Sequence, residues 1–403
     1  MPKLLQLNVT SNWGSTGKIV EAIANNAIER GWESWVAYGR MSNPSNSRTI
    51  KVGTAIDPYV HYVLNRVFDL EGRGSVMATC KLIKQIQDIK PDIIQLHNLH
   101  DHWLNYKILF EYLNKTDIKV VWTFHDFWAV TGHCTHFVQM NCGKFKSVCA
   151  QCPFTKNFFL PILKQTKRTF ELKKKLFTAN KRLTIVPVSD WVNENVCHSF
   201  LKDNKIKVIP NGIDTTIFKP KYNFFHPSIA EDSFVIMAVS SQWKNKGKGL
   251  PYYYAISKLL NKNEIIVLVG LPKNEIKKLP SNIVGVERTD NQEQLASLYT
   301  RANVICSFSS AETFGLTIIE GFACGTPAVV FDNTAPPKLI TPKTGIVVPD
   351  KDYKAAYQAI QEIKKKGKAY YSKSCVQLVK EKYEKEKCFS QYIQLYDELL
   401  KKN

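Results

Sequence analysis

The sequence predicts an α/β fold made of two domains, each with a doubly wound parallel sheet. Strand-like apolar runs alternate with segments of helical period, and the alternation stops and restarts once near the middle of the chain. The length of 403 residues also exceeds what one ordinary core accommodates. Parallel sheets of this kind bind ligands at the carboxyl ends of their strands. We therefore expect two domains that face a central cleft.

The first half opens with a β-α-β unit. Residues 3–9 form the first strand, and residues 18–30 form a helix because isoleucines and alanines recur on one of its faces. Gly31 ends this helix, and residues 34–38 form the next strand. The later elements of this half are helices 77–89 and 105–114 and strands 92–96, 119–124 and 184–188.

A second alternation begins with a strand at residues 234–239. Its later elements are helices 252–260, 292–302 and 317–324 and strands 264–269, 304–307 and 328–331. Residues 218–228 contain prolines and show no periodicity, which is typical of a connection between domains. The last predicted element is a lysine- and tyrosine-rich helix from about Glu381 to Leu400.

These patterns divide the chain into three parts. Residues 1–209 are the predicted N-terminal domain, with a cysteine-rich insertion at 130–153. Residues 210–380 are the predicted C-terminal domain. Residues 381–403 form the terminal helix, which we expect to pack back toward the N-terminal domain.

The composition indicates an anionic partner. Lysine and arginine total 55 and aspartate and glutamate total 35, which gives a net charge of +20. No apolar run approaches the roughly 20 residues that cross a bilayer, and no signal-peptide pattern is present. We therefore expect a cytoplasmic protein whose ten cysteines stay reduced.

Two glutamates separated by seven residues are the strongest motif. Glu312 lies in a predicted loop after a strand, and Glu320 lies in the following helix. Carboxylates accept hydrogen bonds from sugar hydroxyls, and the helix start near Leu316 favours a diphosphate. Gly315 permits the backbone N–H groups to point toward such a ligand. A bare pair of this kind would more often be two ordinary surface glutamates.

A second glycine-containing segment follows the first strand. Gly14, Ser15, Thr16 and Gly17 form a predicted loop before the first helix, where backbone N–H groups and the helix dipole attract phosphate. Asn12 stands where a nucleotide-triphosphatase P-loop needs glycine, so that class is excluded.

These segments occur in an order that resembles a known family. The matching segments are Gly14–Gly17, His125-Asp126, Pro210–Asp214, Lys248–Leu250 and Glu312–Glu320. The chain resembles the retaining glycosyltransferases of family 4, which have the GT-B fold of two Rossmann-like domains. Within that family it looks most like bacterial enzymes of exopolysaccharide, capsule and O-antigen assembly.

The resemblance implies a role for each matching residue. Glu312 would hold hydroxyls of the transferred sugar, and Glu320 would bind the ribose of the nucleotide. Lys248 would neutralise the leaving diphosphate, and His125 would contact the donor sugar or phosphate near the reacting carbon. Backbone N–H groups of the donor site would come from Phe314, Gly315 and Leu316, with Gly14, Ser15, Thr16 and Gly17 also on the donor side.

One element of the family pattern is absent. The family usually has an arginine about five residues before the lysine, and this stretch contains none. Lys246 or Lys244 is the expected substitute, although a lysine lacks the two-pronged guanidinium.

The resemblance also implies the reaction. A sugar, of hexosyl type, would pass with retention from a UDP-, GDP- or dTDP-sugar to a lipid-linked saccharide at the inner face of the plasma membrane. Catalysis would need no metal, and no nucleic acid would bind. One alternative is a GT-B epimerase or phosphorylase, but the sequence shows neither the acid–base pair of the first nor the Schiff-base lysine of the second. The other alternative is a polyanion- or RNA-binding protein, but no RNA-binding motif is present.

Two further segments leave two interpretations open. The cysteines of the insertion either bind one structural zinc or are buried free thiols, and they are Cys134, Cys142, Cys149 and Cys152. Residues 156–182 are basic and rich in phenylalanine, so they form either an anionic-membrane contact centred on Lys173, Lys174 and Lys175 or a solvated helix face.

Three histidines lie between the N-terminal strands and the following helix. His97, His100 and His102 flank Asp101. They form either an acceptor site or an ordinary polar strand end, and the sequence favours the second interpretation.

Overall fold

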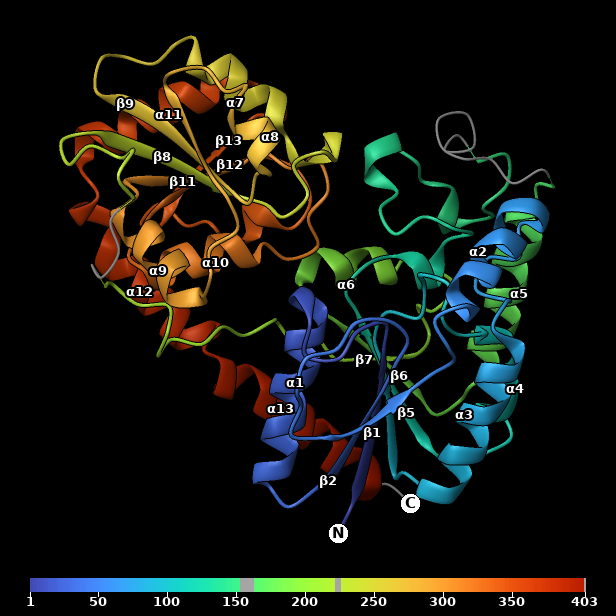
Figure 1. Ribbon diagram of the computed structural model, residues 1–403. Helices are drawn as coiled ribbons and strands as arrows, with labels where there is room; N and C mark the ends of the chain where they lie inside the picture. The colour runs from blue at the N-terminus through green and yellow to red at the C-terminus, as the bar shows by residue number, and fades with distance from the viewer. Residues whose placement is uncertain (153–162, 222–225, 402–403) are drawn as a thin grey trace. The chain divides into compact units, whose positions relative to one another are not determined.

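The computed structural model describes residues 1–152, 163–221 and 226–401. The chain forms two compact units, one of residues 1–210 with 388–403 and the other of residues 211–387. The first unit is therefore discontinuous in sequence, and the chain passes between the units twice (Figure 1).

Unit 1 contains a seven-stranded parallel sheet in the order β3-β2-β1-β4-β5-β6-β7. The strands are β1 (Lys3–Asn8), β2 (Glu33–Tyr38), β3 (Arg48–Lys51), β4 (Ile93–Leu96), β5 (Lys119–Phe124), β6 (Leu183–Pro187) and β7 (Lys205–Ile206). Its helices are α1 (Gly14–Glu29), α2 (Asp57–Phe68), α3 (Val76–Ile89), α4 (Tyr106–Leu113), α5 (Thr166–Ala179), α6 (Asp190–Val196) and the greater part of α13 (Lys385–Lys401).

Unit 2 repeats this architecture with a six-stranded parallel sheet in the order β10-β9-β8-β11-β12-β13. The strands are β8 (Phe234–Val239), β9 (Glu264–Val269), β10 (Ile283–Val286), β11 (Val304–Ser307), β12 (Ala328–Phe331) and β13 (Gly345–Val348). Its helices are α7 (Leu250–Ser257), α8 (Lys273–Ile276), α9 (Gln292–Arg301), α10 (Leu316–Ala323), α11 (Tyr353–Lys366) and α12 (Ala369–Lys382).

The two sheets confirm the predicted doubly wound fold. In each sheet the strand order reverses beside the first strand, between β1 and β4 in unit 1 and between β8 and β11 in unit 2. Such a reversal is where the loops at the carboxyl ends of the strands diverge and leave room for a ligand. The central strands are buried on both faces, as parallel strands covered by helices must be.

The start of α1 differs from the prediction. The helix begins at Gly14, so Gly14–Gly17 are its first turn and do not form a separate loop. A Cβ on Gly17 would come within 2.8 Å of the Thr10 hydroxyl oxygen, so only glycine lets this turn close against the end of β1. The sequence suggested a loop because it contains Gly14 and Gly17, but in the structure glycine permits the close packing of a helix.

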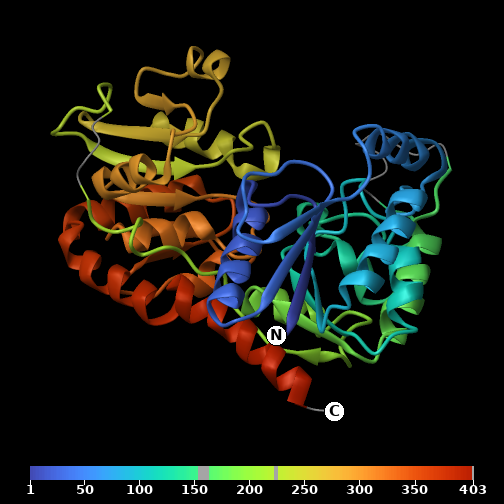
Figure 2. The same cartoon turned by 60° about the horizontal axis from the view of Figure 1, so that its bottom comes forward.

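The predicted terminal helix corresponds to α13, and a short interruption separates it from the preceding helix, α12. α12 ends at Lys382 and α13 begins at Lys385, with Tyr383 accepting a backbone hydrogen bond from Ile213 at 2.9 Å. The interruption lies where the chain leaves unit 2. Figures 1 and 2 both show α13 beside α1 of unit 1.

Buried polar side chains join α13 to the sheet of unit 1. Tyr396 donates a hydrogen bond to Gln95 of β4, and Gln95 donates to the Thr123 hydroxyl of β5 at 2.8 Å. Thr123 in turn bonds Tyr392 of α13 at 3.3 Å. All four side chains are buried, so each hydrogen bond satisfies a group that water does not reach.

Candidate functional site

An ion pair joins two of the predicted catalytic residues in unit 2. The Nζ atom of Lys248 lies 3.1 Å from Oε2 of Glu312, and both side chains are partly exposed. Lys248 ends the short helical turn 246–248 after β8, and Glu312 lies in the loop after β11. Because β8 and β11 are neighbours in the sheet, their carboxyl-end loops bring together residues that are 64 positions apart.

Backbone contacts hold these two loops in register. Ser310 donates its N–H to the carbonyl oxygen of Gly247 at 2.8 Å. Gly249 has φ +80°, and a Cβ on it would lie 2.3 Å from the Phe308 carbonyl oxygen. Glycine is therefore required where the Lys248 turn approaches the end of β11.

The carboxylate of Glu320, the second glutamate of the motif, accepts a hydrogen bond from a buried tyrosine. Tyr299 of α9 donates its hydroxyl hydrogen to Oε2 of Glu320 in α10 at 2.9 Å. Burial and the neighbouring Glu320 carboxylate raise the pKa of Tyr299 well above its ordinary value, so the phenol keeps its proton. The sequence motif contained Glu320 but gave no sign of this partner.

The first turn of α10 lies between the two glutamates. Gly315 precedes it with φ +107°, a conformation that side chains rarely adopt, and Leu316 is the first helical residue. A helix start presents N–H groups that have no acceptor within the helix. The Phe314 side chain packs in the core against Tyr383, so this residue could offer a ligand only its backbone.

A pocket of about 400 Å³ opens at the carboxyl ends of β8, β9 and β10 in unit 2. Its lining includes Trp243, Lys244, Gly270 and Arg288. A Cβ on Gly270 would lie 2.2 Å from the Ser240 carbonyl oxygen, so glycine keeps these two strand ends close together. Arg288 follows β10, a strand that sequence periodicity missed, and it brings a cation to the pocket. Of the two lysines proposed to replace the missing arginine, Lys244 lines this pocket, and Lys246 is exposed in the adjoining turn.

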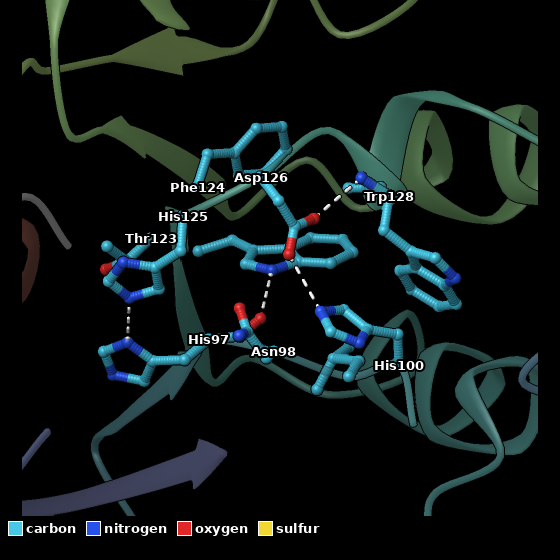
Figure 3. A pocket seen from close by; sticks show the side chains of 11 residues that line it. His97, Asn98, His100, Thr123, Phe124, His125, Asp126 and Trp128 are labelled. Atoms are coloured by element: carbon cyan, nitrogen blue, oxygen red, sulfur yellow. Dashed lines mark hydrogen bonds and ion pairs between the residues drawn. The ribbon is translucent and has the colours of Figure 1, made fainter. Parts of the chain in front are cut away.

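In unit 1, His125 follows β5 and forms a stacked pair with His97, which follows β4 (Figure 3). Their planes differ by 15°, and Nδ1 of His97 lies 3.0 Å from Nε2 of His125. Burial lowers the pKa of both imidazoles, that of His125 to about 4, so both are neutral at physiological pH. His97 had been assigned to an ordinary polar strand end, whereas it is the direct partner of a candidate site residue.

A third histidine, His100, lines a small pocket of unit 1 together with His97 and His125, and it is positively charged. Nε2 of His100 lies 2.8 Å from Oδ2 of Asp126 (Figure 3), and its Nδ1 lies 3.2 Å from Oδ1 of Asp101. Burial alone lowers the pKa of His100, but the two carboxylates outweigh burial and raise it to about 10. The other oxygen of Asp126 accepts the Trp128 backbone N–H at 2.8 Å. The pocket therefore holds one neutral pair of histidines and one imidazolium.

None of the four cysteines of the insertion forms a disulfide with another described residue. Burial and the nearby Cys149 raise the pKa of Cys134 to about 12, and burial also raises the pKa of Cys149. Within residues 1–152, 163–221 and 226–401, no three His, Cys, Asp or Glu side chains are arranged to hold a metal ion. The zinc at Cys134, Cys142, Cys149 and Cys152 stays a prediction.

The expectation that Lys173 faces a membrane is wrong. Lys173 is fully buried, with its Nζ atom 2.7 Å from the Trp128 carbonyl oxygen and 3.5 Å from the centre of the Trp128 ring. Burial lowers its pKa to about 7. Lys174 and Lys175 are exposed. Residues 156–162 of the basic segment lie outside the described residues.

None of the described helices combines the length and the apolar composition that a bilayer crossing requires.

Two family models together match most of the chain. One described as Glycosyltransferase Family 4 matches residues 16–217, and one described as Glycosyl transferases group 1 matches residues 233–366. Among curated proteins, WcaC of Escherichia coli K12, named as a colanic acid biosynthesis glycosyl transferase, is 25% identical over 224 residues, which cover 52% of this chain and 54% of WcaC. The chain thus spans about half the length of the curated relatives that it matches.

Solved structures share the whole fold at low identity. Sucrose-phosphate synthase from Thermosynechococcus elongatus superposes with a TM-score of 0.76 at 16% identity, covering 100% of both chains. Anabaena Alr3699/HepE, solved in complex with UDP, superposes with a TM-score of 0.66 at 13% identity, covering 99% of this chain and 100% of its own.

Proposed function

The chain belongs to Glycosyltransferase Family 4 and has the GT-B fold, and we propose that it transfers a sugar from a nucleotide-sugar donor to a saccharide acceptor with retention. The observation that carries this proposal is the Lys248–Glu312 ion pair, which lies beside the first turn of α10. One cation, one carboxylate and a helix start at adjoining loops suit a diphosphate with a sugar attached.

Most residues of the proposed donor site belong to unit 2. Glu320 would accept hydrogen bonds from the ribose hydroxyls, and the pocket lined by Trp243 and Arg288 would take the rest of the nucleotide. The UDP bound by the structurally similar Anabaena protein makes UDP-sugars the first donors to test. We propose that Gly14–Gly17, at the start of α1, also lie on the donor side.

The proposed chemistry rests on charge that develops during transfer. The diphosphate gains negative charge as the bond to the sugar breaks, so a fixed cation and helix N–H groups stabilise the transition state more than the bound donor. Lys248 would supply the cation, and Leu316 with its neighbours would supply the N–H groups. Glu312, the ion-pair partner of Lys248, would hold sugar hydroxyls and keep the lysine aimed at the phosphates.

The donor hypothesis is tested with two glutamate variants. Glu320→Ala should weaken nucleotide binding, whereas Glu312→Ala should mainly lower turnover, because one carboxylate binds the nucleotide and the other the reacting sugar. Calorimetric titration with UDP, GDP and dTDP and their sugars measures the first, and release of nucleoside diphosphate with an acceptor measures the second. Exposed Glu362→Ala is the matched control. If neither site variant changes binding or turnover, the assignment is wrong.

We further propose a lipid-linked saccharide acceptor in surface polysaccharide assembly, reached at an anionic membrane face. The relative WcaC is named for colanic acid biosynthesis, which supports this class of product. The exposed face of α2 supports the membrane contact, because His61 is the only buried residue of that helix. Large apolar side chains on and beside α2 face solvent, namely Ile56, Tyr59, Val60, Tyr62, Val63, Phe68 and Met77.

The charge beside this apolar face fits an anionic surface. Gln165, just before α5, bonds Asp69 and the Phe68 carbonyl oxygen, so the first turn of α5 lies against the end of α2 (Figure 1). That turn exposes Lys167 and Arg168. A helix with an apolar face beside basic residues is typical of a membrane-interface element.

Vesicle flotation tests the membrane proposal. Tyr59→Ser with Val63→Ser should abolish binding to vesicles of equal parts phosphatidylglycerol and phosphatidylcholine, and Met41→Ser, an exposed apolar residue elsewhere in unit 1, should not. Binding should weaken as salt rises, because screening shortens electrostatic attraction. If the double variant floats like the parent, or if it instead splits a dimer in solution, the membrane role of α2 is wrong.

A further inference from the structure

A buried glutamine in the first strand has a fixed orientation. Gln6 of β1 is completely buried, and its Nε2 atom donates to the Val20 carbonyl oxygen of α1 at 3.0 Å. Turning the amide over would place two oxygens against each other, because a backbone carbonyl oxygen only accepts. The Oε1 atom of Gln6 therefore faces the opposite direction, toward His97.

That orientation determines which nitrogen of His97 carries hydrogen. Nε2 of His97 lies 3.1 Å from Oε1 of Gln6, and an amide oxygen only accepts, so Nε2 is the protonated nitrogen. His97 is 2% exposed, and burial together with His125 lowers its pKa well below the ordinary value. The ring is thus neutral and holds one hydrogen, which leaves Nδ1 bare.

The bare nitrogen of His97 determines in turn which nitrogen of His125 carries hydrogen. The bare Nδ1 of His97 lies 3.0 Å from Nε2 of His125 and can only accept a hydrogen bond (Figure 3). Nε2 of His125 must therefore be the donor. In a neutral imidazole the other nitrogen, Nδ1 of His125, is then an acceptor.

We propose that Gln6 and His97 are positioning residues that lock His125 in one neutral tautomer, with its hydrogen on Nε2 and with Nδ1 as acceptor. Neither residue needs to touch a ligand to do so, because the hydrogen-bond chain from the Val20 carbonyl oxygen has one consistent arrangement. The opposite tautomer of His125 would leave two bare nitrogens facing each other in the core, which is costly.

The locked tautomer selects the kind of ligand group that His125 accepts. In this part of the inference, which rests on the proposed function, any hydrogen bond between a ligand and Nδ1 of His125 is one that the ligand donates, as a sugar hydroxyl can and an ionised phosphate oxygen cannot. His100, held as an imidazolium by Asp126, is the cation of the same pocket. His125 is thus the hydrogen-bond acceptor of this pocket, and His100 is its positive charge.

Nuclear magnetic resonance of the full chain with nitrogen-labelled histidine tests the tautomer directly. Long-range proton–nitrogen spectra distinguish the bare from the protonated nitrogen of each ring, and the His125→Gln spectrum assigns the signals of His125. At neutral pH we expect Nε2 protonated and Nδ1 bare. A hydrogen found on Nδ1 of His125 would overturn the proposal, whether or not any transfer activity has been observed.

Variants test which residues impose the tautomer. Gln6→Leu removes the acceptor of His97, so His125 should then populate both tautomers. Gln95→Leu is the matched control, because Gln95 is the register partner of Gln6 on β4, is equally buried and bonds other residues. If Gln6→Leu leaves the tautomer of His125 unchanged, or if Gln95→Leu alters it as much, Gln6 is not the positioning residue. If Gln6→Leu does not fold, His97→Phe replaces it, because phenylalanine keeps a ring but offers no acceptor. His125 should then also populate both tautomers, and an unchanged tautomer would contradict the role of His97.

Discussion

Glu264, the first residue of β9, should make the stability of unit 2 depend on pH. Its side chain is buried and accepts hydrogen bonds from Lys364 at 2.6 Å, Gln361 at 2.9 Å and Tyr357 at 2.9 Å, all on α11. The Asn261 backbone N–H adds a fourth at 2.8 Å. Burial alone raises the pKa of this carboxyl, but the four donors outweigh it and lower the pKa from 4.5 to about 2.

The magnitude follows from this shift. Each pKa unit corresponds to about 1.4 kcal/mol, so ionised Glu264 contributes about 3 kcal/mol to the free energy of unfolding at neutral pH. Because the folded pKa lies below the unfolded value, the contribution is complete above pH 4.5 and is lost as pH falls toward about 2. Glu264→Gln should therefore be destabilising at neutral pH and nearly neutral in acid.

Hydrogen–deuterium exchange of β9 peptides in urea is the appropriate measurement, because seven of the eight tryptophans belong to unit 1 and fluorescence would report mainly on that unit. Glu362→Gln, whose partner Lys366 is on the exposed side of α11, is the control and should cost less than about 1 kcal/mol. If Glu264→Gln destabilises β9 equally at neutral pH and at about pH 3, charge is not the origin of its effect.

Three further outcomes follow from the candidate site and the insertion. Tyr299→Phe should weaken nucleotide binding roughly ten-fold or more while the fold persists, because a hydrogen bond to a charged group contributes about 1.5–3 kcal/mol. If calorimetry shows an unchanged affinity, the hydrogen bond from Tyr299 does not position Glu320 for the nucleotide. Lys248→Ala should slow transfer more than it weakens donor binding. If Lys248→Ala changes neither kcat nor the donor Kd while Lys244→Ala does, the cation assignment moves to Lys244. Elemental analysis should find about one zinc per chain if the cysteine insertion binds metal, and fully folded metal-free protein would exclude it.

The parallel sheets were predictable because their strands are buried on both faces. β1, β4, β5, β8 and β9 read as continuous apolar runs, which periodicity detects. The edge strands β3, β10 and β13 were missed: each has four residues and is partly exposed, and β10 and β13 each contain a glycine. Helix α2 was missed as well, although Asp57 and Pro58 are typical of a helix start.

The resemblance to a family singled out Glu312, Glu320, Lys248 and His125 from separate motifs, but the sequence did not reveal the partners that the fold brings to them. The spacing of Glu312 and Glu320 alone would not have distinguished them from ordinary surface glutamates. Gln6, His97 and His125 follow or occupy three different strands, and only the β1-β4-β5 pairing brings them together. Lys173 was misplaced for a related reason, since one lysine in a run of three faces inward and composition cannot tell which.

The two-part composition of unit 1 has a consequence for synthesis. A nascent chain that has emerged up to residue 387 already contains all seven strands of the first sheet, but it lacks the side chains of Tyr392 and Tyr396. Gln95 and Thr123 then have buried polar atoms without their final partners. Unit 2 is continuous and has no such requirement. We therefore expect unit 1 to stay in an incomplete, more labile form until α13 is available, whereas unit 2 needs only its own continuous segment to fold.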